Sequence, residues 1–383
     1  MRIGLFINNF FKTQSCKDPG IIAESLCNLG HEVTIYCFST DNKKFGNIEI
    51  KKISKNLGNS IKFWQKEDVD TIILYSWLSL RFLKMIKALK KANKKLLLKL
   101  DSDGHLISPL KPTYLRTFGR KNSPKQWIIH LIRILQWYIF GNIISHKKIK
   151  QLLLCDGAII ESPLALNRLN KSLKHWNKNQ LIKKIHFIPN PINDDITKQI
   201  ITQKKENTII SIGRWNDKQK NKKGLLKVIA QYKTLDWKII LIGQGSDAIK
   251  NKIIESKKTS SNINIESFEK IEHKEIFKYL ISSKIIFAPS NYESFNLAVA
   301  EALCCGCSLA GTPIESFYYF SQNKKFGSIS KNFNSLEIKK TIEIEIDKWN
   351  KKEYSENYIS EYWKKELNAK KVCQDIDKLL KNL

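Results

Sequence analysis

The sequence predicts an α/β protein with two Rossmann-like domains. Its 383 residues exceed what one ordinary core organises and fit two domains of usual size. Short apolar runs rich in Ile and Leu alternate with helical stretches in both halves, which is the pattern of right-handed βαβ units. A hydrophobic content of 42% with nine Trp indicates a folded globular chain.

The composition also limits the class of partner. The formal net charge is +30, but the lysines are spread along the chain without a long basic block. The net charge therefore predicts that the protein binds an anionic ligand or surface. It is weak evidence for binding of nucleic acid, which remains an alternative. The eight cysteines lack zinc-site spacing, and Cys304, Cys305 and Cys307 straddle a predicted helix end, which favours buried structural thiols over a metal site. Because MRIGLFI begins a strand without a secretory pattern, we expect a cytoplasmic protein.

The first half opens with a βαβ unit. Residues 2–7 and 33–38 are predicted strands, and the helix between them is closed by Gly30. Further strands are expected at 71–75, 96–100 and 155–162.

Carboxylates follow the strand at 96–100. Lys99, Asp101 and Asp103 alternate, so in an extended segment they would share one face at the sheet edge where open α/β sheets bind ligands. The alternative is a turn, since D-S-D-G is also good turn chemistry. We favour Asp101 as an acceptor-side group.

A basic and aromatic segment comes next. Apolar residues from Trp127 to Ile139 recur at helical spacing, and His130, Arg133 and Gln136 interrupt them, which argues against a membrane-spanning helix. Residues 127–150 therefore form either an amphipathic helix on an anionic membrane or a helix packed on the core of the first domain.

The second half begins with a strand from Thr208 that ends in Gly213-Arg214, followed by a lysine-rich loop. An arginine fork and a lysine point charge can neutralise a diphosphate, and Lys220 is the favoured lysine, with Lys223 as the runner-up. The next strand, 237–242, leads into Gly243-Gln244-Gly245, which alone is a weak signal.

The most informative stretch is IIFAPSNYESFNLAVAEALCCG, residues 285–306. It predicts a central parallel strand at 285–288 and a helix that starts near Ser294 or Phe295, with Glu293 just before it and Glu301 within it. Eight helical residues rise about 12 Å, so the two carboxylates could hold opposite ends of a long ligand while helix N–H groups face an anion. A sugar nucleotide has this form. An ordinary helix with two exposed glutamates is the alternative.

Glu293-SFNLAVA-Glu301 resembles the E-x7-E signature of the retaining family 4 glycosyltransferases. That resemblance implies the GT-B fold, in which two Rossmann-like domains face a central cleft and a C-terminal helix crosses back to the N-terminal domain. The implied organisation is an acceptor-binding domain at 1–195, a nucleotide-sugar-binding domain at 196–345 and a returning helical segment at 346–383. Tyr358, Trp363 and Leu367 could supply the face that docks that segment on the first domain.

The resemblance also implies residue roles. Glu293 contacts the donor sugar, Glu301 binds the ribose, and Asp101 stands roughly where many members carry a histidine that faces the reacting sugar. The implied donor-binding residues also include Gly213, Arg214, Lys220, Gly243 and Gly245, with the backbone amides of Ser294, Phe295, Asn296 and Leu297. Two departures, Thr13-Gln14 in place of a Gly-Gly pair and the missing histidine, leave an inactive relative as an alternative.

These expectations combine into one functional hypothesis. The chain is a metal-independent hexosyltransferase that moves a hexose from a nucleoside diphosphate sugar to a glycan or lipid-linked acceptor in cell-surface polysaccharide or lipopolysaccharide synthesis. It needs no cofactor besides the donor substrate and binds no nucleic acid. With a lipid-linked acceptor, residues 127–150 would lie on the inner membrane face.

Overall fold

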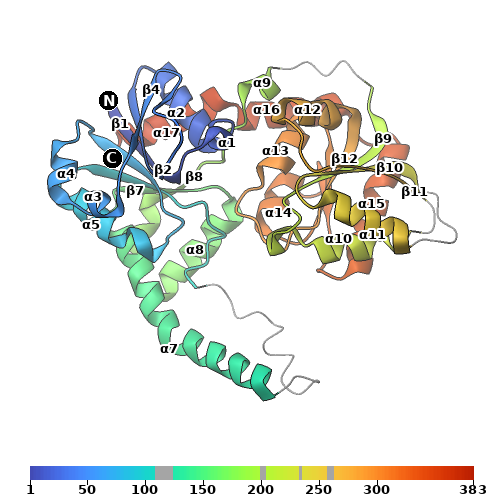
Figure 1. Ribbon diagram of the computed structural model, residues 1–383, viewed down its shortest axis with the longest axis horizontal. Coiled ribbons are helices and arrows are strands. Elements are labelled where there is room, and N and C mark those ends of the chain that lie inside the picture. Colours follow the sequence, from blue (N-terminus) through green and yellow to red (C-terminus); the bar gives the residue numbers. More distant parts are fainter. Residues whose placement is uncertain (108–123, 199–203, 233–234, 257–262) are drawn as a thin grey trace. The chain divides into compact units, whose positions relative to one another are not determined.

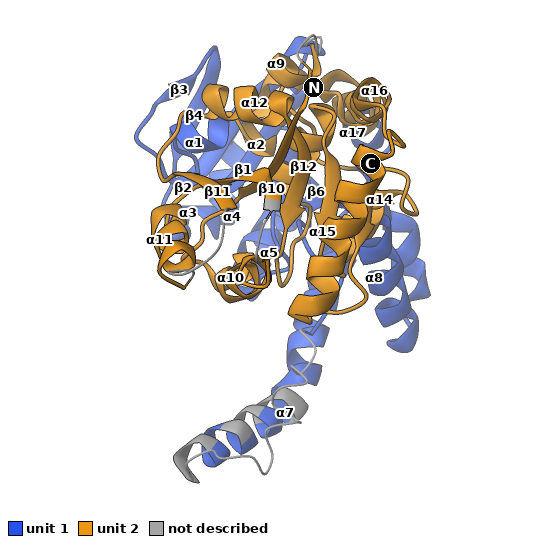
Figure 2. Ribbon diagram, turned by 90° about the vertical axis from the view of Figure 1, so that its right-hand side faces the viewer, with its two compact units in different colours: residues 1–15, 26–188, 376–383 blue, residues 16–25, 189–375 orange. Residues whose placement is uncertain are grey.

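The computed structural model describes residues 1–107, 124–198, 204–232, 235–256 and 263–383. The chain divides into two compact units (Figure 2). Unit 1 comprises Met1–Ser15, Leu26–Ile188 and Ile376–Leu383, and unit 2 comprises Cys16–Ser25 and Pro189–Asp375. Each unit holds one sheet of mainly parallel strands with helices around it (Figure 1), which confirms the predicted α/β class with two such domains.

The sheet of unit 1 has the strand order β3-β4-β2-β1-β5-β6-β7-β8. All neighbours pair in parallel except β3 and β4, which form a short antiparallel edge that the sequence did not predict. The strands are β1 Arg2–Asn9, β2 Glu32–Ser39, β3 Lys44–Phe45, β4 Ile48–Lys52, β5 Thr71–Tyr75, β6 Lys95–Lys99, β7 Gly157–Ile160 and β8 Ile185–Phe187. Because β5, β6 and β7 are consecutive and parallel, the loops after them meet at one edge of the sheet.

Helices in unit 1 pack on a core of aliphatic and aromatic side chains from one face of these strands. The helices are α1 Lys12–Ser15, α2 Asp18–Asn28, α3 Lys55–Gly58, α4 Ile61–Lys66, α5 Leu83–Lys91, α7 Pro124–Leu154 and α8 Pro163–His175. Helix α2 contributes residues to both units.

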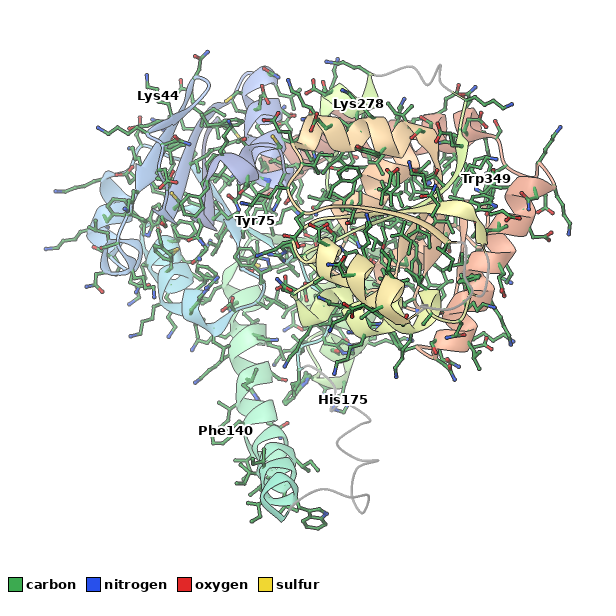
Figure 3. The ribbon with its side chains drawn as sticks, turned by 45° about the vertical axis from the view of Figure 1, so that its right-hand side comes forward. Lys44, Tyr75, Phe140, His175, Lys278 and Trp349 are labelled. Carbon is green, nitrogen blue, oxygen red and sulfur yellow. The ribbon has the colours of Figure 1, made fainter. Side chains whose placement is uncertain are left out.

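The α7 helix is buried on one side and exposed on the other. Gly141, Ser145, Ile149 and Leu152 recur at helical spacing and are buried, and α7 packs on α5. The apolar side chains nearer its start are 40% to 58% exposed: Trp127, Ile128, Ile129, Leu131, Ile132, Leu135, Ile139, Phe140 and Ile143. This part extends away from the sheet of unit 1 (Figure 1), and Phe140 marks it in Figure 3.

The predicted packing of this segment on the first domain's core therefore holds only for its C-terminal part. The nine apolar side chains named above are exposed instead of being packed on that core. Within the described ranges, no helix combines the length and apolar character needed to cross a bilayer.

The sheet of unit 2 is wholly parallel, with the order β11-β10-β9-β12-β13-β14. Its strands are β9 Glu206–Ile212, β10 Leu235–Ile242, β11 Ile263–Phe268, β12 Ser283–Ala288, β13 Ser308–Gly311 and β14 Gly327–Ile329. Strand β12 lies between β9 and β13, so the predicted central parallel strand is confirmed. Its near-continuous apolar run suits a strand buried on both faces.

Helices of unit 2 form two groups that cover the sheet (Figure 1). One group joins α10 with α11 and α15, and the other joins α13 with α9, α12 and α16. The helix bounds are α9 Asp194–Thr197, α10 Lys222–Ile229, α11 Ser246–Ser256, α12 His273–Ser282, α13 Leu297–Cys304, α14 Glu315–Ser321, α15 Ser335–Asn350, α16 Glu356–Leu367 and α17 Ala369–Lys381. Helix α17 contributes residues to both units.

The C-terminal end returns to unit 1, as predicted. Residues 376–383 belong to that unit, where the Asp377 carboxylate accepts a hydrogen bond from His31 Nε2 at 2.9 Å. Two of the expected docking residues are wrong, however. Trp363 and Leu367 of α16 are fully buried in the core of unit 2. There the Trp363 ring packs on Phe320 and Phe326.

Candidate functional site

Glu293 is the centre of a polar cluster in unit 2. It lies in the loop between β12 and α13, and only 7% of the residue is exposed. Its Oε1 accepts hydrogen bonds from Lys220 Nζ at 2.6 Å, Ser290 Oγ at 2.8 Å and Asn296 Nδ2 at 3.2 Å, and its Oε2 accepts one from Gln219 Nε2 at 2.6 Å. A buried carboxylate needs this many donors, and they fix its orientation.

The glycines predicted to bind the donor lie beside Lys220. A Cβ at Gly213 would come within 3.1 Å of Lys220 Cγ, so the lysine stem packs directly on this backbone. A Cβ at Gly243, which has a φ of +110°, would lie 2.2 Å from the Gly213 carbonyl oxygen. Gly243 therefore requires glycine, whereas a Cβ at Gly213 would only crowd the lysine stem, and the ends of β9 and β10 approach each other closely at these two glycines.

Arg214 does not join this cluster. Its side chain is 72% exposed, and its guanidinium pairs with the Asp217 carboxylate at 3.0 Å. Gly245, with a φ of +88°, lies next to Asn216, and its N–H donates to Glu269 Oε1 at 3.2 Å. An exposed pair such as Arg214–Asp217 contributes about 0 to 1 kcal/mol, so the guanidinium is free to exchange Asp217 for another anion at little cost.

The start of α13 differs from the prediction. The helix begins at Leu297, because Asn296 adopts a φ of +77° and caps it, accepting a hydrogen bond from Val299 N–H at 3.3 Å. Phe295 is 1% exposed and its ring packs on Phe320, so its side chain anchors the loop in the core. Only the backbone of Phe295 remains available for the predicted donor contact.

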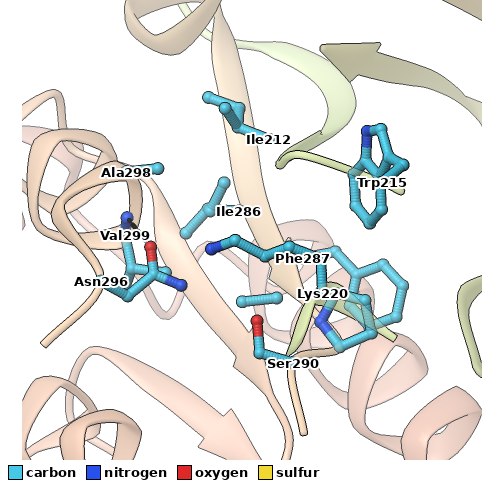
Figure 4. Close-up of a pocket in the computed structure, with 11 residues that line it drawn as sticks. Ile212, Trp215, Lys220, Ile286, Phe287, Ser290, Asn296, Ala298 and Val299 are labelled. Carbon is cyan, nitrogen blue, oxygen red and sulfur yellow. Dashed lines mark hydrogen bonds between the residues drawn. The ribbon is translucent and has the colours of Figure 1, made fainter. Parts of the chain in front are cut away.

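A small cavity lies between Lys220 and the start of α13 (Figure 4). Trp215, Ser290, Asn296 and Val299 are among its lining residues, and the Lys220 side chain extends toward Asn296. Its volume is about 10 Å³, which is room for about one water molecule. The cavity therefore leaves a small gap between Lys220 and the start of α13, and it is too small to hold a substrate.

Glu301 has a partner that sequence reasoning missed. It is 8% exposed, and its Oε1 accepts a hydrogen bond from His273 Nε2 at 3.0 Å. His273 begins α12, and the bond to Glu301 raises the pKa of His273 above its usual value. A single histidine among charged residues carries no sequence pattern, and only the contact between α12 and α13 identifies it.

Asp101 lies in unit 1, directly after β6. Its Oδ2 accepts a hydrogen bond from Trp77 Nε1 at 3.0 Å. The predicted shared face of Lys99, Asp101 and Asp103 is wrong, because Asp101 has a φ of +43° and breaks the extended conformation. Lys99 is instead buried, and Asp103 forms a turn in which its Oδ1 accepts from the N–H of His105 at 3.1 Å.

Cys304, Cys305 and Cys307 are buried in the core of unit 2, and burial raises the pKa of each thiol. Cys307 Sγ donates to the Leu280 carbonyl at 3.2 Å. Across the described ranges, no group of three or more His, Cys, Asp or Glu side chains is placed to hold a metal ion.

Comparisons with known proteins agree with this architecture. Residues 193–366 match the family model described as "Glycosyl transferases group 1". No curated protein sequence matches the chain. Among solved structures, sucrose-phosphate synthase from Thermosynechococcus elongatus superposes with a TM-score of 0.68 at 13% identity, covering 100% of this chain and 98% of the other.

Two further structures have the same fold. HepE from Anabaena, solved in complex with UDP-glucose, gives a TM-score of 0.66 at 12% identity and covers 100% of both chains. WaaG, a glycosyltransferase involved in lipopolysaccharide biosynthesis, gives 0.58 at 12% identity and covers 97% of this chain and 95% of its own. Residues 193–366 are therefore similar to the group 1 glycosyltransferases, and the whole chain has the two-domain GT-B fold of these solved structures.

Proposed function

We propose that this protein is a retaining glycosyltransferase that moves a hexose from a nucleoside diphosphate sugar to a glycan or lipid-linked acceptor. The observation that carries the proposal is the Lys220–Glu293 cluster, which joins a cation and an oriented carboxylate at the carboxyl edge of β9 and β12. Open α/β sheets bind ligands at this edge. That HepE was solved with UDP-glucose supports a donor of this class.

Leaving-group stabilisation is the main catalytic effect in this proposal. Lys220 contributes a point charge next to the start of α13, and Arg214 leaves Asp217 to bind the diphosphate as a fork. These groups neutralise the nucleoside diphosphate as the bond to the sugar breaks, so the proposal does not require a metal ion.

The two glutamates orient the donor at its two ends. Glu293 accepts hydrogen bonds from sugar hydroxyls, and its four protein donors hold it in place for that role. Glu301 binds the ribose hydroxyls with its second oxygen while His273 holds the first. On the acceptor side, Asp101 of unit 1 accepts a hydrogen bond from the attacking hydroxyl group.

The exposed face of α7 is proposed to bind an anionic lipid surface. Nine apolar side chains between Trp127 and Ile143 are exposed, and lysines follow at Lys147, Lys148 and Lys150. An apolar stripe flanked by cations is what anionic bilayers bind at their interface. A membrane-bound enzyme could reach a lipid-linked acceptor in cell-surface polysaccharide or lipopolysaccharide synthesis. WaaG, which has the same fold, is involved in lipopolysaccharide biosynthesis.

A thermal-shift screen of nucleoside diphosphate hexoses tests the donor proposal. A ligand that binds only the folded state stabilises it by an amount that grows with the logarithm of ligand concentration over Kd, so UDP-, GDP- or ADP-linked hexoses at about 100 times Kd add about 2.7 kcal/mol of stability and raise Tm. We expect one base to give a clear shift, while a duplex DNA of equal charge concentration gives none. A screen in which no donor shifts Tm, or in which only the duplex does, contradicts the proposal.

A further inference from the structure

A buried ion pair lies beneath Asp101 in unit 1. Lys99 at the end of β6 and Glu161 just past β7 are 1% and 0% exposed, and Lys99 Nζ lies 2.6 Å from Glu161 Oε1. Removing two charges from water often requires more free energy than their attraction returns, so a buried pair contributes little to stability by itself. Its contacts indicate another role.

Glu161 holds the backbone of the loop after β6. Its Oε1 also accepts a hydrogen bond from the Asp101 N–H at 3.0 Å. Asp101 has a φ of +43°, a left-handed conformation that is unfavourable for a residue other than glycine and persists only where neighbours enforce it. Glu161 therefore fixes the Asp101 backbone, and the indole of Trp77 fixes its carboxylate.

The environment of Glu161 makes this contact sensitive to pH. Burial and, to a smaller extent, the charge of Asp101 raise the pKa of Glu161 to about 7, although the ammonium of Lys99 opposes the rise. Its second oxygen, Oε2, is buried and has no hydrogen-bond partner among the described residues. From β5, the Tyr75 ring faces the pair, with its centroid 5.6 Å from Lys99 Nζ.

We propose that Glu161 is a positioning residue for the transfer reaction, which with Lys99 holds the Asp101 carboxylate against Trp77 and releases it when Glu161 is protonated. The inference rests on the proposed function only in giving Asp101 an acceptor-side role. Protonation leaves Lys99 without its anion and turns Glu161 into a weaker acceptor for the Asp101 N–H. The strained loop then relaxes, and Trp77 loses its partner.

The indole N–H resonance of Trp77, assigned with Trp77→Phe, tests the contact without needing turnover. In the wild type it should shift with pH along a single titration curve in the neutral range. In Glu161→Gln this titration should vanish. Lys99→Met/Glu161→Leu replaces the pair by apolar groups, a change that folded proteins often tolerate, and should also abolish it.

The matched control is Asp156→Asn. Asp156 accepts hydrogen bonds from Lys90 Nζ and from the Leu96 N–H, both at 2.8 Å, so it makes the same two kinds of contact at the opposite end of β6. This substitution should leave the Trp77 titration unchanged.

Steady-state kinetics give the second readout. Glu161→Gln should lower kcat by about 10- to 100-fold, the usual effect of displacing a reacting group, while the donor Kd stays within about twofold of wild type. A folded Glu161→Gln protein whose Trp77 signal titrates as in wild type overturns the inference. If the Trp77 titration is lost as expected but Asp101→Asn keeps full transfer activity, the positioning contact stands and the role of Asp101 in the proposed function fails.

Discussion

Lys220 is the cation on which the Glu293 cluster depends. The Lys220→Ala change leaves Glu293 buried with three neutral donors and no cation. We therefore expect the free energy of unfolding to fall by about 1 to 3 kcal/mol, the usual effect of removing one partner of a buried charged hydrogen bond. Urea unfolding measures this change.

Lys223→Ala is the matched control for that experiment, because Lys223 is an exposed lysine in the first turn of α10, three residues after Lys220. It should change stability by less than about 0.5 kcal/mol. If the two variants are equally stable, the cluster around Glu293 is not formed in solution.

His273 gives unit 2 a pH-dependent contact. The pKa of His273 is raised in the folded state, so the stability that its bond to Glu301 contributes is fully present below the unfolded-state pKa of about 6.5. It is lost as the pH rises through the folded-state pKa. The stability difference between wild type and His273→Asn should therefore shrink from about pH 6 to about pH 8 in urea unfolding.

His175→Asn provides the control, because it removes an exposed histidine of unit 1 and leaves the contact between His273 and Glu301 intact. A wild-type advantage over His273→Asn that grows with pH would show that the histidine is neutral in the folded protein.

The elements of the fold show where sequence patterns suffice and where they do not. Strand β12 was predictable because a strand buried on both faces reads as a continuous apolar run. The start of α13 was not, because the left-handed φ of Asn296 moves it beyond Phe295, and a helical pattern of apolar residues does not locate its own cap. Strand β3 of the antiparallel edge has only two residues, which leave no periodic signal.

The sequence predicted that α7 is a helix, but it did not decide whether the helix packs on the core of the first domain or lies on a membrane. We expect Leu135→Glu/Ile139→Glu to abolish sedimentation of the protein with phosphatidylglycerol-containing vesicles, because both side chains are more than half exposed on the apolar stripe. Asn142→Glu adds a charge at an exposed polar position of the same helix and should reduce vesicle binding far less.

Sedimentation velocity separates this account from self-association. Under the membrane proposal, wild type and the double variant have the same oligomeric state without lipid. A wild-type dimer that the double variant dissociates, with no vesicle binding by either, would assign the stripe to a second copy of the chain.

At the scale of the whole molecule, local motifs identified only part of the candidate site. Gly213, Lys220 and Glu293 were predictable because each belongs to a short motif at the end of a strand. His273 and Glu161 were not, since each acts through a contact between elements that are distant in the sequence. The pairing of Arg214 with Asp217 could not be predicted from the sequence, because a sequence pattern does not fix which anion an exposed guanidinium contacts.

The central claim is that unit 2 binds a nucleoside diphosphate sugar through Arg214 and Glu301, and isothermal titration calorimetry with the donor found by the thermal-shift screen tests it most directly. Arg214→Ala and Glu301→Ala should each weaken donor binding by about 1 to 3 kcal/mol, the typical loss for a charge-assisted hydrogen bond. Lys351→Ala, which removes an exposed cation of unit 2, should leave donor binding unchanged. Equal donor affinity in wild type, Arg214→Ala and Glu301→Ala would contradict the account.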